Sequence, residues 1–307
     1  MGGGRSTNYF GAKADSLKKK LRQSEERTKN EEYEAKVADL LSSLLTKFND
    51  RDYDSINNHL KDIKDALEEE LEGTLDLLFG GSVAKHTYVD GFSDIDSLVL
   101  LDSCELADGS PQNAKLYFAQ RLQDHFPDAV VKAGRLAVTI EFDDAEIQLL
   151  PAISCEKHVK IADSKGKEWS LIRPKEFTEV LTRTNQQVGR KVIPVVKLAK
   201  AIIANLPEKH KISGYHAESL AVEVFKGYKG DLNHKAMLRH YFQEASQLVL
   251  RPIQDSTGQS VHVDDYLGAR NTLERRIVSD AFSRVGRRMI NADNSSSLDA
   301  WSNLFQE

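Results

Sequence analysis

The pattern with the clearest chemical content lies between Phe79 and Asp96. Phe79-Gly80-Gly81-Ser82 is followed, after eleven residues, by Asp94-Ile95-Asp96, and an apolar run begins shortly behind the second aspartate. Side chains two residues apart on a strand point to the same face, so Asp94 and Asp96 can share divalent cations. Two such cations stabilise the attacking and the leaving oxygen of a phosphoryl transfer. Hard oxygen ligands favour Mg²⁺ or Mn²⁺ here.

Each half of this pattern also has a simpler explanation. An isolated Asp-x-Asp can mark a solvated strand edge, and Gly-Gly-Ser alone can be only a turn. Together they indicate more, because aspartate is depleted in strands and a pair buried beside Leu98–Leu101 needs a compensating cation. Gly81 lets the backbone approach a phosphate closely, and Ser82 adds a hydroxyl donor. The pattern therefore predicts a site for a metal ion and a phosphate.

The elements that position these residues follow from the hydrophobic periodicity. Residues 11–78 are expected to form two or three helices with a break at Asp50–Asp54, followed by a strand over Ile95–Leu101. Pro111–Phe126 has a helical pattern, and Leu136–Phe142 alternates before a hairpin turn into Glu146–Leu150. Ser154–Lys167 is expected to connect to a second half made of helices, and Asn291–Ser297 to be a polar linker. Those helices are expected over Pro174–Asn185, Val192–Asn205, Tyr215–Tyr228, Leu232–Leu250 and Ala269–Met289.

Further along the chain an ordered series of short motifs carries a family resemblance. The series comprises Gln148–Ala152, Trp169–Pro174, Lys197–Ala201, Ser213–Glu218, Asp255–Gly258 and Val263–Leu267. With Gly81-Ser82 and Asp94-x-Asp96 it resembles the polymerase-beta-like nucleotidyltransferase superfamily. Within that superfamily it is similar to the bacterial CD-NTases, relatives of cyclic GMP-AMP synthase and oligoadenylate synthase that act in antiphage CBASS defence. The resemblance extends over roughly residues 75–289.

The resemblance implies an α+β fold with a polymerase-beta-like core, a small mixed sheet, and a helical carboxy-terminal lobe similar to that of oligoadenylate synthase. We place the core with its amino-terminal helices at 11–168 and the helical lobe at 169–307. The implied reaction joins nucleoside triphosphates, ATP among them, into a cyclic di- or trinucleotide messenger and releases pyrophosphate. The implied catalytic residues are Asp94, Asp96 and Glu146, with Asp94 and Asp96 as the ligands of Mg²⁺ or Mn²⁺. The residues that the resemblance assigns to the nucleotide are Gly81, Ser82, Gln148, Lys197, Lys200, Ser213 and Tyr215.

Gln148 is the one departure from the family pattern. A third carboxylate normally stands three residues before the proline of the second strand, and here that position is Gln148, before Pro151. Glu146 lies two residues earlier, on the same face of the strand. Either Glu146 completes the metal site, or two carboxylates hold the cations alone, or both residues form only a polar strand face.

Composition and charge restrict the other functions. The formal net charge is -5, so no global attraction to nucleic acid or anionic lipid is expected. Cys104 and Cys155 are too few for a disulfide framework or a structural zinc site. No apolar run approaches the roughly 20 residues that span a bilayer, and the polar N-terminus is unlike a secretory signal, so we expect a cytoplasmic protein without a membrane partner.

The first thirty residues carry eight Lys or Arg against three acids. This arm is expected to be a solvated helix or a contact with a partner protein, such as a CBASS regulator, rather than a site for a nucleic-acid activator. Template-independent addition of nucleotides to RNA is a second enzymatic interpretation. A nucleotide-binding pseudoenzyme is a third, because of Gln148. No P-loop, Rossmann or hydrolase motif is present.

Overall fold

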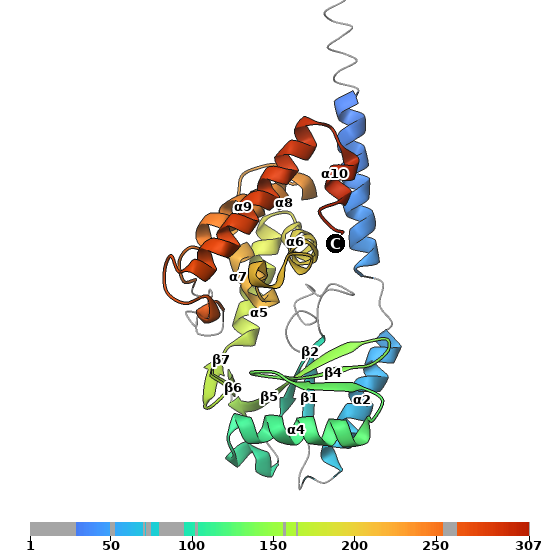
Figure 1. Cartoon of the computed structure of the whole chain (residues 1–307), viewed down its shortest axis with the longest axis vertical. Coiled ribbons are helices and arrows are strands. Elements are labelled where there is room, and N and C mark those ends of the chain that lie inside the picture. Colours follow the sequence, from blue (N-terminus) through green and yellow to red (C-terminus); the bar gives the residue numbers. More distant parts are fainter. Residues whose placement is uncertain are drawn as a thin grey trace, which may run out of the picture.

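The computed structural model describes residues 29–49, 53–69, 71, 75–79, 95–101, 104–155, 158–163, 165–253 and 263–306. Gly81, Ser82, Asp94 and residues 255–258 therefore lie outside the described residues, and Asp96 is described by its backbone alone. Two lobes are visible in Figure 1, a sheet with helices beside it and a larger group of helices. No helix among the described residues is long and apolar enough to cross a membrane.

The first lobe is built on a mixed sheet of seven described strands. Five of them follow the order β1-β2-β5-β4-β3, and β6 joins β5 to β7. Only β2 and β5 are parallel, and the other described pairs are antiparallel. The strands are β1 (Asp76–Phe79), β2 (Ile95–Leu100), β3 (Val130–Ala133), β4 (Val138–Glu141), β5 (Glu146–Cys155), β6 (His158–Ala162) and β7 (Trp169–Ile172).

One face of this sheet is covered by α2 (Tyr53–Glu68) and α4 (Pro111–His125). Alternate residues of β4 and β5, among them Ile140 and Ile147, are fully buried in a core that includes Phe118 of α4. The start of α4 is set locally, since the Ser110 side chain accepts a hydrogen bond from the Asn113 backbone N–H and Pro111 occupies the first turn. The intervening residues of β4 and β5 therefore face away from this core.

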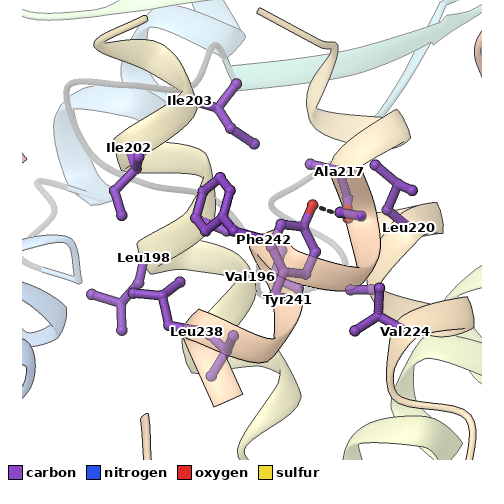
Figure 2. Close-up of a cluster of buried hydrophobic side chains, with 14 of the residues drawn as sticks. Val196, Leu198, Ile202, Ile203, Ala217, Leu220, Val224, Leu238, Tyr241 and Phe242 are labelled. Carbon is purple, nitrogen blue, oxygen red and sulfur yellow. Dashed lines mark hydrogen bonds between the residues drawn. The ribbon is translucent and has the colours of Figure 1, made fainter. Parts of the chain in front are cut away.

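The second lobe is helical and has its own core. Its helices are α5 (Pro174–Gln187), α6 (Val192–Ala204), α7 (Gly214–Val224), α8 (His234–Leu248), α9 (Leu273–Asn294) and α10 (Leu298–Ser302). Figure 2 shows side chains of α6, α7 and α8 meeting in this core, where the Tyr241 hydroxyl donates to the Ala217 carbonyl at 3.0 Å. α6 is apolar around most of its circumference, which is why it lies at the centre of the lobe.

The helix over residues 29–47 packs on the helical lobe, not on the sheet. Tyr33, Val37, Leu41 and Phe48 are buried in the same core as α6–α9. The Tyr33 hydroxyl donates to the Ala292 carbonyl at 3.1 Å, and the helix lies beside α10 in Figure 1. Our predicted grouping of this helix with residues 11–168 therefore differs from its packing.

Other expectations were wrong in detail. Asp76–Phe79 forms β1 where the end of a helix was expected, and β3, β6 and β7 were not predicted. β7 pairs with β6, so the sheet lobe continues to Ile172, past the boundary that we placed at residue 168. α9 extends to Asn294, through most of the expected polar linker, and α10 follows with Trp301 buried. The α+β fold, the strand β2, the β4–β5 hairpin and the helices α2 and α4–α9 are confirmed.

Candidate active site

Four strands place polar residues in one row across the sheet. The register pairs Asp96 of β2 with Gln148 of β5, Gln148 with Thr139 of β4, and Thr139 with Lys132 of β3. Gln148, Thr139 and Lys132 project from the open face, because residues paired in register on neighbouring strands share a face. Gln148 therefore lies directly beside Asp96, at the position where the sequence pattern led us to expect a third carboxylate.

A second row on the same face carries two acids. Glu146 of β5 is in register with Glu141 of β4. Lys132 forms an ion pair with Glu141, and this hydrogen bond raises the pKa of the Lys132 ammonium, with smaller contributions from the charges of Glu141 and Glu146. The side chain of Glu146 is exposed and has no ion pair or hydrogen-bond partner among the described residues. It is therefore a carboxylate on the open face whose oxygens are available to a ligand.

The helical lobe brings Lys200 and Ser213 together at the start of α7. Ser213 is the N-cap residue, and its hydroxyl accepts a hydrogen bond from the His216 backbone N–H at 3.2 Å. Lys200 of α6 reaches the same turn. Its Nζ would lie only 3.2 Å from a Cβ atom built on Gly214, the first residue of α7. A helix N-terminus beside a lysine is a favourable environment for an anion.

Lys200 is also half of a buried ion pair. Its Nζ lies 2.6 Å from Glu218 Oε1, and the two side chains are only 6% and 1% exposed. Glu218 was not among our predicted site residues, although it stands in the motif Ser213–Glu218. The available signal was the presence of charged residues in two mainly apolar helices, α6 and α7.

The two remaining predicted residues have other surroundings. Lys197 donates to the side chain of Asn49, at the end of the helix over residues 29–47. Tyr215 packs edge-on against Phe177 of α5, with ring centroids 4.7 Å apart. The structure therefore brings Lys200, Ser213 and Tyr215 to one end of α7, while Lys197 contacts a different element.

The sequence matches one known domain family. The profile of the Second Messenger Oligonucleotide or Dinucleotide Synthetase (SMODS) domain matches residues 32–185. The chain belongs to this family. It is therefore a nucleotidyltransferase of the class that synthesises cyclic oligonucleotide second messengers. No curated protein sequence matches the chain.

Solved structures of several other proteins share the fold. Escherichia coli DncV with bound 3'-deoxy GTP is 13% identical, with 96% of this chain and 91% of that chain covered and a TM-score of 0.64. E. coli MS115-1 CdnC with ATP is 15% identical, with 83% and 92% covered and a TM-score of 0.61. The Elizabethkingia meningoseptica CdnE cyclic dinucleotide synthase is 14% identical, with 75% and 92% covered and a TM-score of 0.57. At these identities the similarity concerns the fold.

Proposed function

We propose that this SMODS protein joins nucleoside triphosphates, ATP among them, into a cyclic di- or trinucleotide and releases pyrophosphate, as the messenger-producing step of CBASS antiphage defence. The observation that carries the proposal is the strand register, which sets Asp96 of β2 beside Gln148 of β5, with Glu146 two residues before Gln148 on the same strand. The first turn of α7, where Lys200 and Ser213 meet, supports it from the other lobe.

The donor set of this face fits Mg²⁺ or Mn²⁺. Asp94, Asp96 and Glu146 supply carboxylate oxygens, and Gln148 supplies an amide oxygen, which are the hard ligands these cations prefer. A cation bound there would polarise the phosphoryl oxygens and stabilise the departing pyrophosphate. We propose Asp94 and Asp96 as its ligands and Glu146 as the third carboxylate. The spacing supports this proposal, because Glu146 stands two residues before Gln148 and Asp94 stands two residues before Asp96.

The other predicted residues hold the nucleotide in this proposal. Gly81 and Ser82 bind the triphosphate of the donor by their backbone and hydroxyl groups, and Lys200 and Ser213 bind it from the turn of α7. Tyr215 stacks on the donor base from its place beside Phe177. Lys197 adds positive charge to α6 while it holds Asn49. A phosphate anion gains from these donors because they are oriented before it binds.

The setting of the reaction is part of the proposal. We place the protein in the cytoplasm, where its triphosphate substrates are found, and expect a regulatory protein as its partner. The E. coli MS115-1 relative CdnC has been solved in a complex named CdnC:HORMA-deltaN. The partner of this chain would be a protein of the same defence system.

Mass spectrometry of the products formed from the four nucleoside triphosphates and Mg²⁺ tests the proposal. We expect small cyclic products and pyrophosphate without any RNA primer. A folded Asp94→Asn and Asp96→Asn double variant should form neither, because it cannot hold the cation. Products that appear only when an RNA primer is added would instead identify an RNA nucleotidyltransferase.

Gln148 favours one competing function, a protein that binds nucleotide without joining it. An amide oxygen beside Asp96 binds Mg²⁺ more weakly than a carboxylate would. Nucleotide binding without pyrophosphate release in every mixture of substrates, with and without a regulatory protein, would establish that function and overturn our proposal.

A further inference from the structure

The hydroxyl of Thr139 is a polar group on the open face of the sheet that the proposed reaction does not yet use. Thr139 stands in the middle of the polar row, with Gln148 of β5 on one side and Lys132 of β3 on the other. It is half-buried, and its hydroxyl has no hydrogen-bond partner among the residues that the structure describes. Adjacent strands lie about 4.8 Å apart, so Thr139 is about 10 Å from the backbone of Asp96, two strands away. This distance from the proposed cation site is comparable to the length of a nucleoside.

The strand order determines from which side each substrate can approach. β1 lies on one side of β2, and β5, β4 and β3 follow on the other side. Gly81 and Ser82, which hold the donor triphosphate in our proposal, stand two and three residues after Phe79, the last residue of β1. In a phosphoryl transfer the attacking and the leaving oxygen lie roughly in line, on opposite sides of the phosphorus. Because the pyrophosphate leaves on the side of β1, the second nucleotide, the acceptor, attacks from the side of β5 and β4.

The charges on this part of the sheet indicate which end of the acceptor lies there. Lys132 is ion-paired with Glu141 of β4, and Glu146 of β5 is in register with Glu141. Two carboxylates and one ammonium leave a net negative charge beside Thr139, which repels a second triphosphate. An uncharged nucleobase is not repelled, and a hydroxyl that both donates and accepts suits the polar edge of a base. The base of the acceptor, rather than its triphosphate, therefore fits over β4.

We infer that Thr139 hydrogen-bonds the base of the acceptor nucleotide and contributes to the choice of that base. The inference rests on the proposed function for the positions of the cation and of the donor. It adds a residue of β4 outside the predicted set, with a role in substrate specificity. The loss of such a hydrogen bond weakens most the base that makes it, so the ratio between acceptors changes.

The test separates the two substrates with 2',3'-dideoxynucleoside triphosphates. These nucleotides have no hydroxyl for the attack, so they serve only as donors, and each ordinary nucleoside triphosphate is offered in turn as the acceptor. Mass spectrometry of the linear products that end in the dideoxynucleotide gives kcat/KM for four acceptors with one donor, and for four donors with one acceptor. The full-length variants are Thr139→Val, which replaces the hydroxyl by a methyl group of similar size, and Thr139→Ser, which keeps the hydroxyl.

We expect Thr139→Val to lower kcat/KM about tenfold for the preferred acceptor, as for the loss of one hydrogen bond, and to affect the other acceptors less. The preference among the four donors should stay unchanged, and Thr139→Ser should keep the acceptor preference of the wild type. The control is Thr46→Val on the helix over residues 29–47, where the Thr46 hydroxyl donates to the Ser42 carbonyl at 3.1 Å. This control should match the wild type in both series.

The outcomes separate the inference from the proposed function. An unchanged acceptor preference in Thr139→Val would overturn the inference, and so would a wild type that uses all four acceptors equally. An equal loss of kcat/KM for every acceptor and every donor would also overturn it, because that result indicates a disturbed sheet. A wild type that forms no linear product from any pair of nucleotides would overturn the proposed function instead.

Discussion

The residue at position 148 sets the local charge of the sheet beside Asp96, because the two positions are paired in register. A carboxylate there would repel Asp96 when no cation is bound and would bind one strongly, whereas the amide does neither. Glu146 can compensate because its carboxylate is exposed on the same face and Lys132 bonds Glu141 instead. If Glu146 supplies the third negative charge, the proposed metal site has a displaced carboxylate ligand. If Glu146 does not supply it, the proposed site lacks one carboxylate ligand.

We predict that Glu146→Gln abolishes product formation, while Gln148→Asp changes the turnover rate by less than about threefold, since the cation site is already complete. Initial rates in Mg²⁺ and Mn²⁺ measure both effects. A faster Gln148→Asp variant together with an active Glu146→Gln variant would show that the position is vacant and that our assignment of Glu146 is wrong.

Lys200 combines a binding role with a structural one, because its partner Glu218 is buried. We predict that Lys200→Ala destabilises the fold by about 3–5 kcal/mol, since it leaves a buried carboxylate uncompensated. The double variant Lys200→Met with Glu218→Gln should recover most of that stability but still show a raised KM for nucleoside triphosphate. Denaturant unfolding and steady-state kinetics measure the two effects, and a normal KM in the double variant would restrict Lys200 to the structural role.

At the scale of the elements, periodicity predicted the longer elements that bury one face and missed the strands of four or five residues. β2, the β4–β5 hairpin and helices α4–α9 follow apolar patterns that the sequence displays directly. β3 is mostly exposed and four residues long, and β6 and β7 are strands of five and four residues on either side of the polar sequence Asp163–Glu168. Such short strands exist because a neighbouring strand supplies hydrogen bonds, which no local pattern records.

The same limit applies to the candidate site. Lys200, Ser213 and Tyr215 were predicted from short motifs, and the structure places them together. Glu218 was not predicted, because its part in the site depends on its contact with Lys200 of another helix. The assignments of Gly81, Ser82 and Asp94 stay predictions.

The helix over residues 29–47 shows how amphipathicity identifies a buried face without identifying the surface that covers it. Leu41 is fully buried in the core of the helical lobe. We predict that Leu41→Ala lowers the free energy of unfolding by about 2–5 kcal/mol, as for other buried leucines. The control is Ser42→Ala on the exposed side of the helix, which should change stability by less than about 0.5 kcal/mol. Equal, small effects of both substitutions in urea unfolding would contradict this packing.

At the scale of the whole molecule, the buried His216 makes stability depend on pH. Its pKa is about 4 in the folded protein, against about 6.5 in an unfolded chain, so between these values the unfolded state binds a proton that the folded state does not. Stability therefore rises with pH across this window and is lost as the pH falls from 6.5 towards 4, by up to roughly 3 kcal/mol from this group. Burial also lowers the pKa of His210 and His234, which adds to the loss in the same direction.

The contribution of His216 can be isolated with His216→Gln, whose amide can still hydrogen-bond the Tyr266 hydroxyl, 2.9 Å from His216 Nδ1, but does not titrate. We predict that, between pH 6.5 and 4.5, the free energy of unfolding in urea falls by roughly 2 kcal/mol more for the wild type than for the variant. The variant has no imidazole at this position that must stay unprotonated in the folded state. Parallel pH profiles for wild type and His216→Gln would mean that His216 takes up its proton in the folded state without cost.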